Sequence, residues 1–268
     1  MAIPDTVLEE QESLREKTVK IGQIARICSV FGVESIQVFR DPRGKGESAL
    51  IKRVLEYLET PQYLRRRLFP LDESLKFAGL LPPLRIPSHK PKVSLNRLQI
   101  GEFRDGLVLA DGRAVDVGLE KPLIMRQELG NERRITVKIT SVMPLEGIVV
   151  DRSQTGEYWG YEVEVKSADE VLSNSRYGTR IATSRLGDPI SSRVGDLRAR
   201  LAGPKGVLLL FGSPSRGLFV MMRNLRQRVD FVLNLYPEQH SVTVRTEEAM
   251  SSGLYLLEIL DALGNTKV

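Results

Sequence analysis

The sequence predicts an α/β protein in which a parallel sheet with covering helices is interrupted by a small β-barrel. Two features of the 268-residue chain support this class. Both terminal parts alternate short apolar runs with helical patterns, which is typical of a parallel sheet. The middle part instead has short runs rich in Val and Ile between turn residues, which is typical of a barrel or sandwich. We therefore assign residues 1–90 and 166–268 to one α/β domain and residues 91–165 to an inserted OB-like barrel.

The N-terminal part is predicted to contain a strand between two helices. Ile21, Ile24 and Cys28 recur at helical spacing, which indicates a helix within residues 8–31. A strand is expected over Ser35–Phe39. The second helix is expected from about Glu47 to Glu59, because Pro61 disfavours helical geometry in the residue before it.

A basic segment follows the second helix. Arg65, Arg66 and Arg67 are consecutive, so they cannot all share one face of a helix. They fit either a solvated helical turn or a patch that contacts RNA phosphates. The prolines at 82, 83 and 87 predict an extended linker that leads into the inserted domain.

The inserted domain is predicted to be built from short strands. These strands are expected at Gly106–Ala110, Ala114–Gly118, Ile135–Ile139, Gly147–Val150 and Tyr158–Val165. OB-folds often bind oligonucleotides, so Arg133 and Arg134 are candidates for RNA binding. Trp159 could stack on a base or belong to the core of the barrel.

The C-terminal third is predicted to place three loops side by side. Val207–Phe211 and Phe231–Leu235 are apolar runs typical of buried strands, and loops 212–218 and 234–243 follow them. A third loop is expected at 183–188. Ser213 and Pro214 suit the start of a helix, and a last helix is expected near Thr246. The carboxyl ends of parallel strands form ligand crevices, so we expect a binding site among these loops.

Two motifs in this region resemble a known family. GSPSRGL at 212–218 and NLYPEQHSVTVRTEEA at 234–249 are similar to the C-terminal motifs of the SPOUT superfamily, in the branch whose catalytic domain contains an OB-like insert. The resemblance implies a trefoil-knotted, Rossmann-like domain, although knotted chains are rare. It also implies a homodimeric RNA methyltransferase that uses S-adenosylmethionine and acts on uridine N3 of ribosomal RNA.

The resemblance further implies roles for individual residues. Methylation of N3 requires that a proton leave the base, and Asp188 or Glu248 could accept it. Arg185, Arg216 and Arg245 could stabilise the resulting anion or hold phosphate, and we take Arg185, Arg245 and Asp188 as the catalytic candidates. We expect the missing side chain of Gly212 to make room for the cofactor. The expected cofactor-binding residues are Thr183, Arg185, Gly187, Gly212, Pro214, Gly217, Asn234, Gln239 and Thr243.

Composition is consistent with an RNA partner and argues against a disulfide, a zinc site and a membrane span. The formal net charge of +5 favours a polyanionic partner. One cysteine and two distant histidines provide neither a disulfide nor zinc-ligand spacing, so we expect no metal. No apolar run approaches the roughly 20 residues of a membrane span, and we expect a cytoplasmic protein without a membrane partner. The alternative function is a non-catalytic RNA-binding module that uses the OB-like insert and the basic surface.

Overall fold

The computed structural model describes residues 1–110, 112–126, 129, 133–203 and 205–265. The chain forms two compact units. One unit comprises Met1–Leu55, Phe77–Leu81 and Tyr161–Val268, and the other comprises Glu56–Lys76 and Pro82–Gly160. The second unit therefore includes residues before Pro91, where we expected the insert to begin. The division into domains at residues 91 and 165 stays a prediction.

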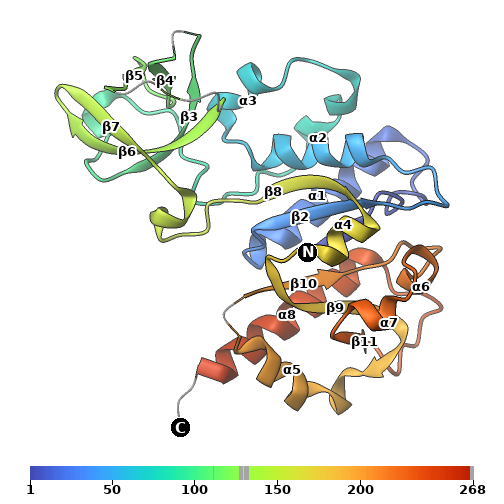
Figure 1. Ribbon diagram of the computed structural model, residues 1–268. Helices are drawn as coiled ribbons and strands as arrows, with labels where there is room; N and C mark the ends of the chain where they lie inside the picture. Colours follow the sequence, from blue (N-terminus) through green and yellow to red (C-terminus); the bar gives the residue numbers. More distant parts are fainter. Residues whose placement is uncertain (111, 127–128, 130–132, 204, 266–268) are drawn as a thin grey trace. The chain divides into compact units, whose positions relative to one another are not determined.

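The first unit is built on a six-stranded sheet in which all neighbouring strands are parallel (Figure 1). This confirms the predicted α/β class with a parallel sheet. The strand order is β11-β9-β10-β1-β2-β8. The strands are β1 (Ala2–Pro4), β2 (Ser35–Arg40), β8 (Glu162–Ser167), β9 (Tyr177–Pro189), β10 (Gly206–Leu210) and β11 (Phe231–Asn234).

Strand β1 was not predicted, although it lies near the middle of the sheet. Ala2 and Ile3 are fully buried, and they pair with Gln37 and Val38 of β2, while Ala2 also pairs with Leu210 of β10. Three residues are too few to show an alternating or apolar pattern. The N-terminal strand is therefore defined by its partners and not by its own sequence.

The predicted strand Tyr158–Val165 is also corrected. Glu162–Ser167 forms β8 at the edge of the parallel sheet, where Val163 pairs with Ile36 of β2. Trp159 belongs instead to the second unit. Residues 158–165 therefore lie partly in each unit, and no change of pattern within this stretch marks the boundary.

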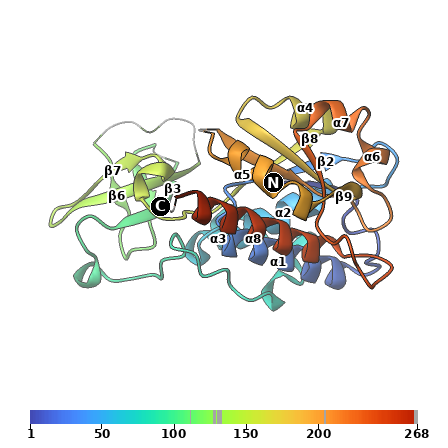
Figure 2. The ribbon, with the colours of Figure 1, turned by 90° about the horizontal axis from the view of Figure 1, so that it is seen from below.

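Helices cover both faces of the sheet (Figure 2). α1 (Leu14–Val30) and α8 (Thr246–Asn265) lie against each other on one face, and α5 (Val194–Leu201) contacts α8. α1 begins at a capping box in which Ser13 accepts from the Glu16 amide. α4 (Ala168–Ser173), α6 (Leu218–Met221) and α7 (Leu225–Arg228) pack on the other face. Their buried residues, among them Leu172, Leu218 and Leu225, form one core with strand residues.

The remaining helical elements are short, apart from α2 (Ser48–Glu59), which matches the prediction. α3 spans Gln62–Leu68, and 3-10 helices span Glu73–Leu75, Ala78–Leu80, Leu95–Arg97, Arg152–Thr155 and Ile190–Ser192. Within the described part of the chain, no helix combines the length and apolarity needed to cross a membrane.

The second unit contains a nearly closed antiparallel sheet. Its strands β3 (Phe103–Val108), β4 (Ala114–Asp116), β5 (Leu123–Ile124), β6 (Arg134–Val142) and β7 (Leu145–Val150) follow the order β5-β4-β3-β6-β7, and the two end strands approach each other. Val115, Leu123 and Val137 are fully buried inside this barrel-like sheet. Tyr63 and Leu64 of α3 pack on Leu107, so α3 is part of the same unit.

Candidate functional site

A cavity of about 320 Å³ lies at the carboxyl ends of β10 and β11 and beside residues 183–186 within β9, and three loops surround it. This volume lies within the range of small-molecule sites, roughly 300–1,000 Å³. Its apolar walls include Phe219, Leu235 and Ala249. Eight of the nine predicted cofactor-binding residues line it, namely Thr183, Arg185, Gly212, Pro214, Gly217, Asn234, Gln239 and Thr243. The crevice predicted at the carboxyl ends of the strands is therefore present.

The first loop is an excursion within strand β9. Val232 of β11 pairs with Ala182, but the next residue, Leu233, pairs with Asp188, so residues 183–187 leave the ladder. Side chains from neighbouring elements hold this excursion in place. Thr183 Oγ1 donates to the Leu210 carbonyl at 2.9 Å, and Asn234 Nδ2 donates to the Arg185 carbonyl at 3.3 Å.

Gly187 closes the excursion without lining the cavity. A Cβ atom on Gly187 would lie 2.6 Å from the Val232 carbonyl oxygen and 2.7 Å from the Leu233 carbonyl carbon. Both atoms are backbone atoms of β11, so neither can turn away. The return of the chain to the sheet at this point thus requires glycine.

Arg226 of α7 supports the same excursion and was not singled out by sequence reasoning. Its Nη2 donates to the Leu186 carbonyl at 2.9 Å, and its guanidinium lies 5.3 Å from the ring centroid of Phe219. Phe219 and Leu186 both line the cavity. No spacing in the sequence relates Arg226 to a loop 40 residues earlier.

The second loop is a tight reversal that follows β10. The Ser213 amide donates to the Arg216 carbonyl at 2.9 Å, and the Arg216 amide donates to Ser213 Oγ at 3.2 Å. The helix that we expected at Ser213 and Pro214 begins later, at Leu218, because this reversal comes first. A Cβ atom on Gly212 would lie 2.9 Å from the Arg216 carbonyl oxygen, so Gly212 makes room for its own loop.

Two carboxylates from the N-terminal half hold the second loop. Glu9 accepts from Ser213 Oγ at 2.6 Å, from the Ser215 amide at 2.9 Å and from Arg216 Nη2 at 3.1 Å. Arg216 Nε donates to Asp41 Oδ2 at 2.9 Å. Burial raises the pKa of Glu9, but the hydrogen bonds from Ser213 and Ser215 and the charge of Arg216 outweigh it and lower the pKa. The guanidinium of Arg216 therefore holds the loop in place, and its charge is balanced by Glu9 and Asp41.

The third loop is folded by its own polar side chains. Asn234 Oδ1 accepts from the Tyr236 amide at 3.0 Å, and Gln239 Nε2 donates to the Ser241 carbonyl at 2.9 Å. Thr246 Oγ1 donates to the Gly212 carbonyl at 3.3 Å, which joins the third loop to the second. Polar contacts within and between the loops thus define the cavity.

The structure does not bring the three catalytic candidates together. Arg185 lines the cavity and is exposed at its rim. Arg245 lines a separate polar cleft of about 650 Å³ beside α1, where Lys20 pairs with Glu247 at 3.0 Å. Asp188 pairs with Arg193 at 2.7 Å. Glu248 accepts from the Arg245 amide at 2.8 Å and so caps the start of α8.

Four of the five RNA-binding candidates have structural partners, since Arg67 pairs with Asp116 at 3.2 Å and Arg133 Nη2 donates to the Arg67 carbonyl at 3.0 Å. Arg65 donates to the carbonyls of Thr60 at 2.8 Å and Leu58 at 2.9 Å, at the end of α2. Arg134 pairs with Glu59 at 2.5 Å and also with Asp105. The guanidinium groups of Arg65 and Arg134 are occupied within the unit, and their role in RNA binding stays a prediction. Arg66, Arg67 and Arg133 remain exposed.

A buried ionic cluster accounts for Arg134. Asp105 is fully buried and accepts from Thr136 Oγ1 at 2.9 Å and from Trp159 Nε1 at 2.7 Å. Burial lowers the pKa of Arg134, but Glu59 and Asp105 raise it overall. Trp159 is only 4% exposed, so it belongs to the core of this unit and does not offer a stacking surface.

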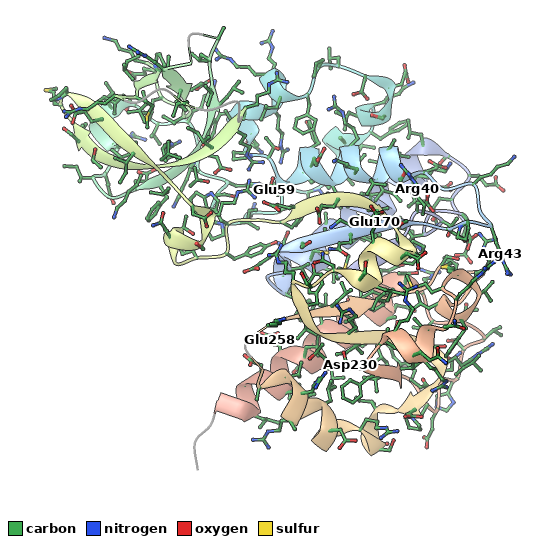
Figure 3. The ribbon with its side chains drawn as sticks, in the orientation of Figure 1. Arg40, Arg43, Glu59, Glu170, Asp230 and Glu258 are labelled. Carbon is green, nitrogen blue, oxygen red and sulfur yellow. The ribbon has the colours of Figure 1, made fainter. Side chains whose placement is uncertain are left out.

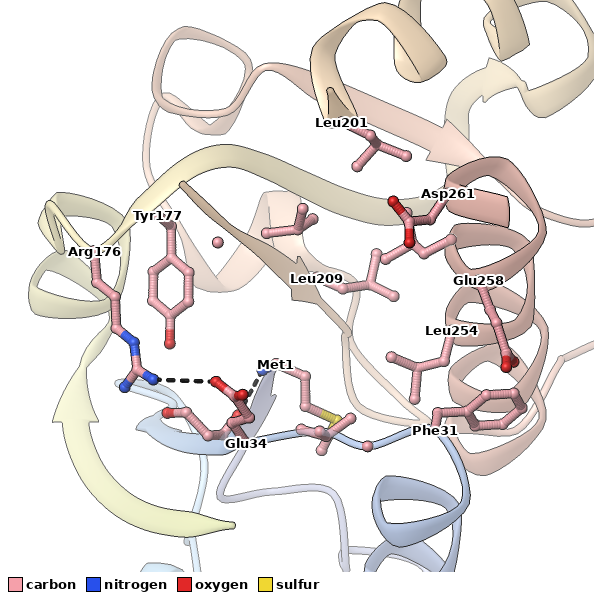
Figure 4. A pocket seen from close by; sticks show the side chains of 16 residues that line it. Met1, Phe31, Glu34, Arg176, Tyr177, Leu201, Leu209, Leu254, Glu258 and Asp261 are labelled. Carbon is pink, nitrogen blue, oxygen red and sulfur yellow. Dashed lines mark hydrogen bonds and ion pairs between the residues drawn. The ribbon is translucent and has the colours of Figure 1, made fainter. Parts of the chain in front are cut away.

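A second cavity of about 420 Å³ lies at the opposite ends of the strands (Figure 4). Its floor is apolar and includes Leu209 and Leu254, while Glu258 and Asp261 of α8 lie at its edge. It contains none of the predicted site residues. In the described residues, no group of His, Cys, Asp and Glu side chains could hold a metal ion.

Comparison with known proteins defines the class to which this fold and cavity belong. The model of a family described as "Putative RNA methyltransferase" matches residues 1–257. The chain is 32% identical to the 28S rRNA (uridine-N(3))-methyltransferase of Mus musculus and 31% identical to that of Homo sapiens. These matches cover 96% of this chain and 75% and 77% of the two relatives.

An archaeal relative matches over nearly its whole length. The chain is 33% identical to an uncharacterized protein of Haloarcula marismortui, over 97% of this chain and 98% of that protein. The chain belongs to this RNA methyltransferase family, which confirms the resemblance drawn from its C-terminal motifs. It is therefore an enzyme of the methyltransferase class.

Proposed function

We propose that the protein transfers a methyl group from S-adenosylmethionine to N3 of a uridine in ribosomal RNA. The observation that carries this proposal is the convergence of the three loops on one cavity in a chain of this family. The cavity suits the cofactor because its lining combines apolar side chains with polar residues of the three loops. The relatives named as uridine-N3 methyltransferases support the substrate.

When bound, the cofactor supplies a methyl group on a positively charged sulfonium, and the neutral thioether is the leaving group. The protein then mainly aligns the donor and the acceptor, and alignment alone can contribute about 7–11 kcal/mol. Arg185 is an exposed cation on the rim of the cavity, and in this proposal N3 gives its proton to water and Arg185 stabilises the uridine anion that results. The loop contacts of Thr183, Asn234 and Thr246 hold the cavity in shape before binding.

The fold and assembly that the SPOUT resemblance implies are part of the same proposal. The excursion at 183–187 and the position of β9 between β11 and β10 support a knotted path for the C-terminal segment. Tyr255, Ile259 and Leu263 lie on one face of α8 and are 57%, 38% and 52% exposed, which supports a homodimer. Leu186 and Val242 on the cavity lining are 66% and 87% exposed, as expected if a partner subunit covers them.

The nearly closed barrel is proposed to be an OB-like RNA-binding domain. Arg66, Arg67 and Arg133 are its exposed candidates, although Arg67 also pairs with Asp116 at 3.2 Å. These cations would contact phosphates and so contribute to affinity without selecting a sequence.

The test measures methyl transfer directly. Purified protein is incubated with isotope-labelled S-adenosylmethionine and ribosomal RNA from cells that lack its gene, and the nucleosides are analysed by mass spectrometry. We expect labelled 3-methyluridine, at a stoichiometry near one per ribosomal RNA molecule. Cofactor binding without transfer to naked RNA or ribosomal subunits would contradict the proposal and favour a non-catalytic RNA-binding module.

A further inference from the structure

A loop with two exposed cations lies next to the reversal that follows β10, and apart from Asp41 its residues have no part in the site described so far. Residues 41–47 connect β2 to α2, with the sequence Asp-Pro-Arg-Gly-Lys-Gly-Glu. The loop lies against Arg216, because the Cβ position of Gly44 is 2.6 Å from Arg216 Nη2. Arg216 itself lines the cavity. The loop is therefore an immediate neighbour of the cofactor-binding region within the same compact unit.

The two carboxylates of this loop are already occupied. Asp41 is buried and accepts from Arg216 Nε at 2.9 Å, from Thr6 Oγ1 at 3.2 Å and from the Arg43 amide at 2.9 Å. Glu47 pairs with Lys17 of α1. Neither carboxylate is free to neutralise the cations of the loop.

Arg43 and Lys45 are the uncompensated charges of the loop. Both side chains are exposed, and neither forms an ion pair with any residue in the described ranges. Arg43 projects from the surface at this edge of the molecule (Figure 3). Two cations on a loop that is anchored through Asp41 present a fixed positive surface, which is the chemistry that binds the phosphates of a nucleic acid.

We propose that Arg43 and Lys45 bind backbone phosphates of the RNA substrate, and that the Asp41–Arg216 ion pair fixes them beside the cofactor cavity. The proposal rests on the function proposed above and adds an RNA-binding element outside the barrel. Phosphate contacts position a nucleic acid without reading its sequence. Their place next to the cavity would set the register of the RNA relative to the methyl donor.

The experiment compares Arg43→Ala/Lys45→Ala with Arg198→Ala/Lys205→Ala. The control pair removes the same charge from two exposed residues, Arg198 in α5 and Lys205 at the amino end of β10, whereas the cavity lies at the carboxyl end of β10. Binding of a large-subunit ribosomal RNA transcript is measured from 50 to 200 mM salt. For Arg43→Ala/Lys45→Ala we expect the slope of log K against log salt to be shallower by about 1.4, because each lost phosphate contact contributes about 0.7.

Affinity and cofactor binding provide the other measurements. At 50 mM salt the Arg43→Ala/Lys45→Ala protein should bind RNA about tenfold more weakly, and Arg43→Glu/Lys45→Glu still more weakly, because RNA affinity depends on the neutralisation of phosphates. Binding of S-adenosylmethionine, measured by calorimetry, should be unchanged. A salt slope and RNA affinity equal to those of the control pair would overturn the inference, and so would a loss confined to cofactor binding. If the wild type transfers no methyl group, the proposed function fails instead, whatever the slopes show.

Discussion

Arg216 Nη2 lies 3.1 Å from Glu9 Oε2, across 207 residues of sequence, and this ion pair fixes the loop that follows β10. Glu9 also accepts from Ser213 and Ser215 of the same loop. The N-terminal segment thus shapes one wall of the cavity without entering it. Glu9 is a positioning residue in the proposed enzyme, and its effect should appear in cofactor binding.

Replacement of Glu9 should weaken cofactor binding selectively. Glu9→Gln keeps the size of the side chain but loses the charge that pairs with Arg216, and such charged hydrogen bonds contribute about 1.5–3 kcal/mol. We expect the KM for S-adenosylmethionine to rise about tenfold, while kcat and the KM for RNA stay near wild-type values. Steady-state kinetics with each substrate varied in turn provide the measurement. Glu10→Gln, at the exposed neighbouring position, is the control.

A general loss of folded protein would lower the apparent kcat in proportion to the active fraction and would leave both KM values unchanged. That pattern, or unchanged kinetics in Glu9→Gln, would remove Glu9 from the positioning role. In a double-mutant cycle, Glu9→Ala and Arg216→Ala should be non-additive, because each variant alone already removes the ion pair between these two residues.

Substitution of Gly187 should destabilise the first unit. An alanine Cβ would meet backbone atoms of β11 at 2.6–2.8 Å, and overpacking of this kind costs about 1–3 kcal/mol. The free energy of unfolding of Gly187→Ala, from urea titration, should fall by that amount. Gly217→Ala is the matched control, because its Cβ would meet nothing within 4 Å. Equal stabilities of the two variants would show that the excursion can relax around a side chain.

The exposed apolar stripe of α8 should be required for dimerisation. Ile259→Asp places a charge between Tyr255 and Leu263, and burial of an unpaired charge in an interface is strongly unfavourable. We expect the variant to elute as a monomer in size-exclusion chromatography with light scattering, whereas the wild type elutes as a dimer. Ile148→Asp, at an exposed position of β7 in the second unit, is the control. A wild-type monomer, or a dimer of Ile259→Asp, would contradict the proposed interface.

His89 should make stability fall at acidic pH. Its Nε2 lies 2.8 Å from the Glu59 carbonyl oxygen, and burial lowers its pKa to about 4. The unfolded chain therefore binds a proton at His89 near pH 6.5, whereas the folded chain does not bind it until about pH 4. The contribution of neutral His89 to the free energy of unfolding is complete above pH 6.5 and is lost as pH falls toward 4. After allowance for solvent screening, the loss amounts to about 2 kcal/mol.

The measurement compares urea unfolding of the wild type and His89→Asn at pH 7.5 and pH 5. The wild type should lose more stability than the variant over this interval. His240→Asn, at an exposed position, should keep the wild-type pH dependence. If His89→Asn showed the same pH dependence as the wild type, His89 would not be the group responsible.

The sequence predicted those parts of the fold that are specified locally. α2 has apolar residues at helical spacing, the strands β10 and β11 are continuous apolar runs, and the Gly212 and Asn234 motifs located the cavity. Local sequence patterns did not predict the elements whose structure depends on pairing with distant strands. β1 has three residues and becomes a strand only because β2 and β10 flank it. The excursion at 183–187 depends on the pairing of β11 with β9, and β11 begins 43 residues after Asp188, where the ladder resumes.

Prediction of the site from the sequence was limited in the same way. Residue types and their order indicated which loops meet, but not how each side chain is used. Arg216, Arg245 and Arg134 looked alike as exposed cations in the sequence. In the structure Arg216 pairs with Glu9 and Asp41, the partly buried Arg134 pairs with Glu59 and Asp105, and Arg245 lines another cleft. Long-range ion pairs decide these roles, and no spacing in the chain encodes them.

Calorimetry of S-adenosylmethionine binding to the wild type and to Ala249→Phe tests the central claim most directly. Ala249 lines the cavity from α8, so a phenyl ring there would fill it, whereas Ala199→Phe changes an exposed residue of α5. We predict one molecule bound per chain in the wild type and in Ala199→Phe. For Ala249→Phe we predict affinity at least about tenfold weaker, a difference of about 1.4 kcal/mol. Absence of binding to the wild type, or equal affinity in Ala249→Phe, would contradict the assignment of this cavity to the methyl donor.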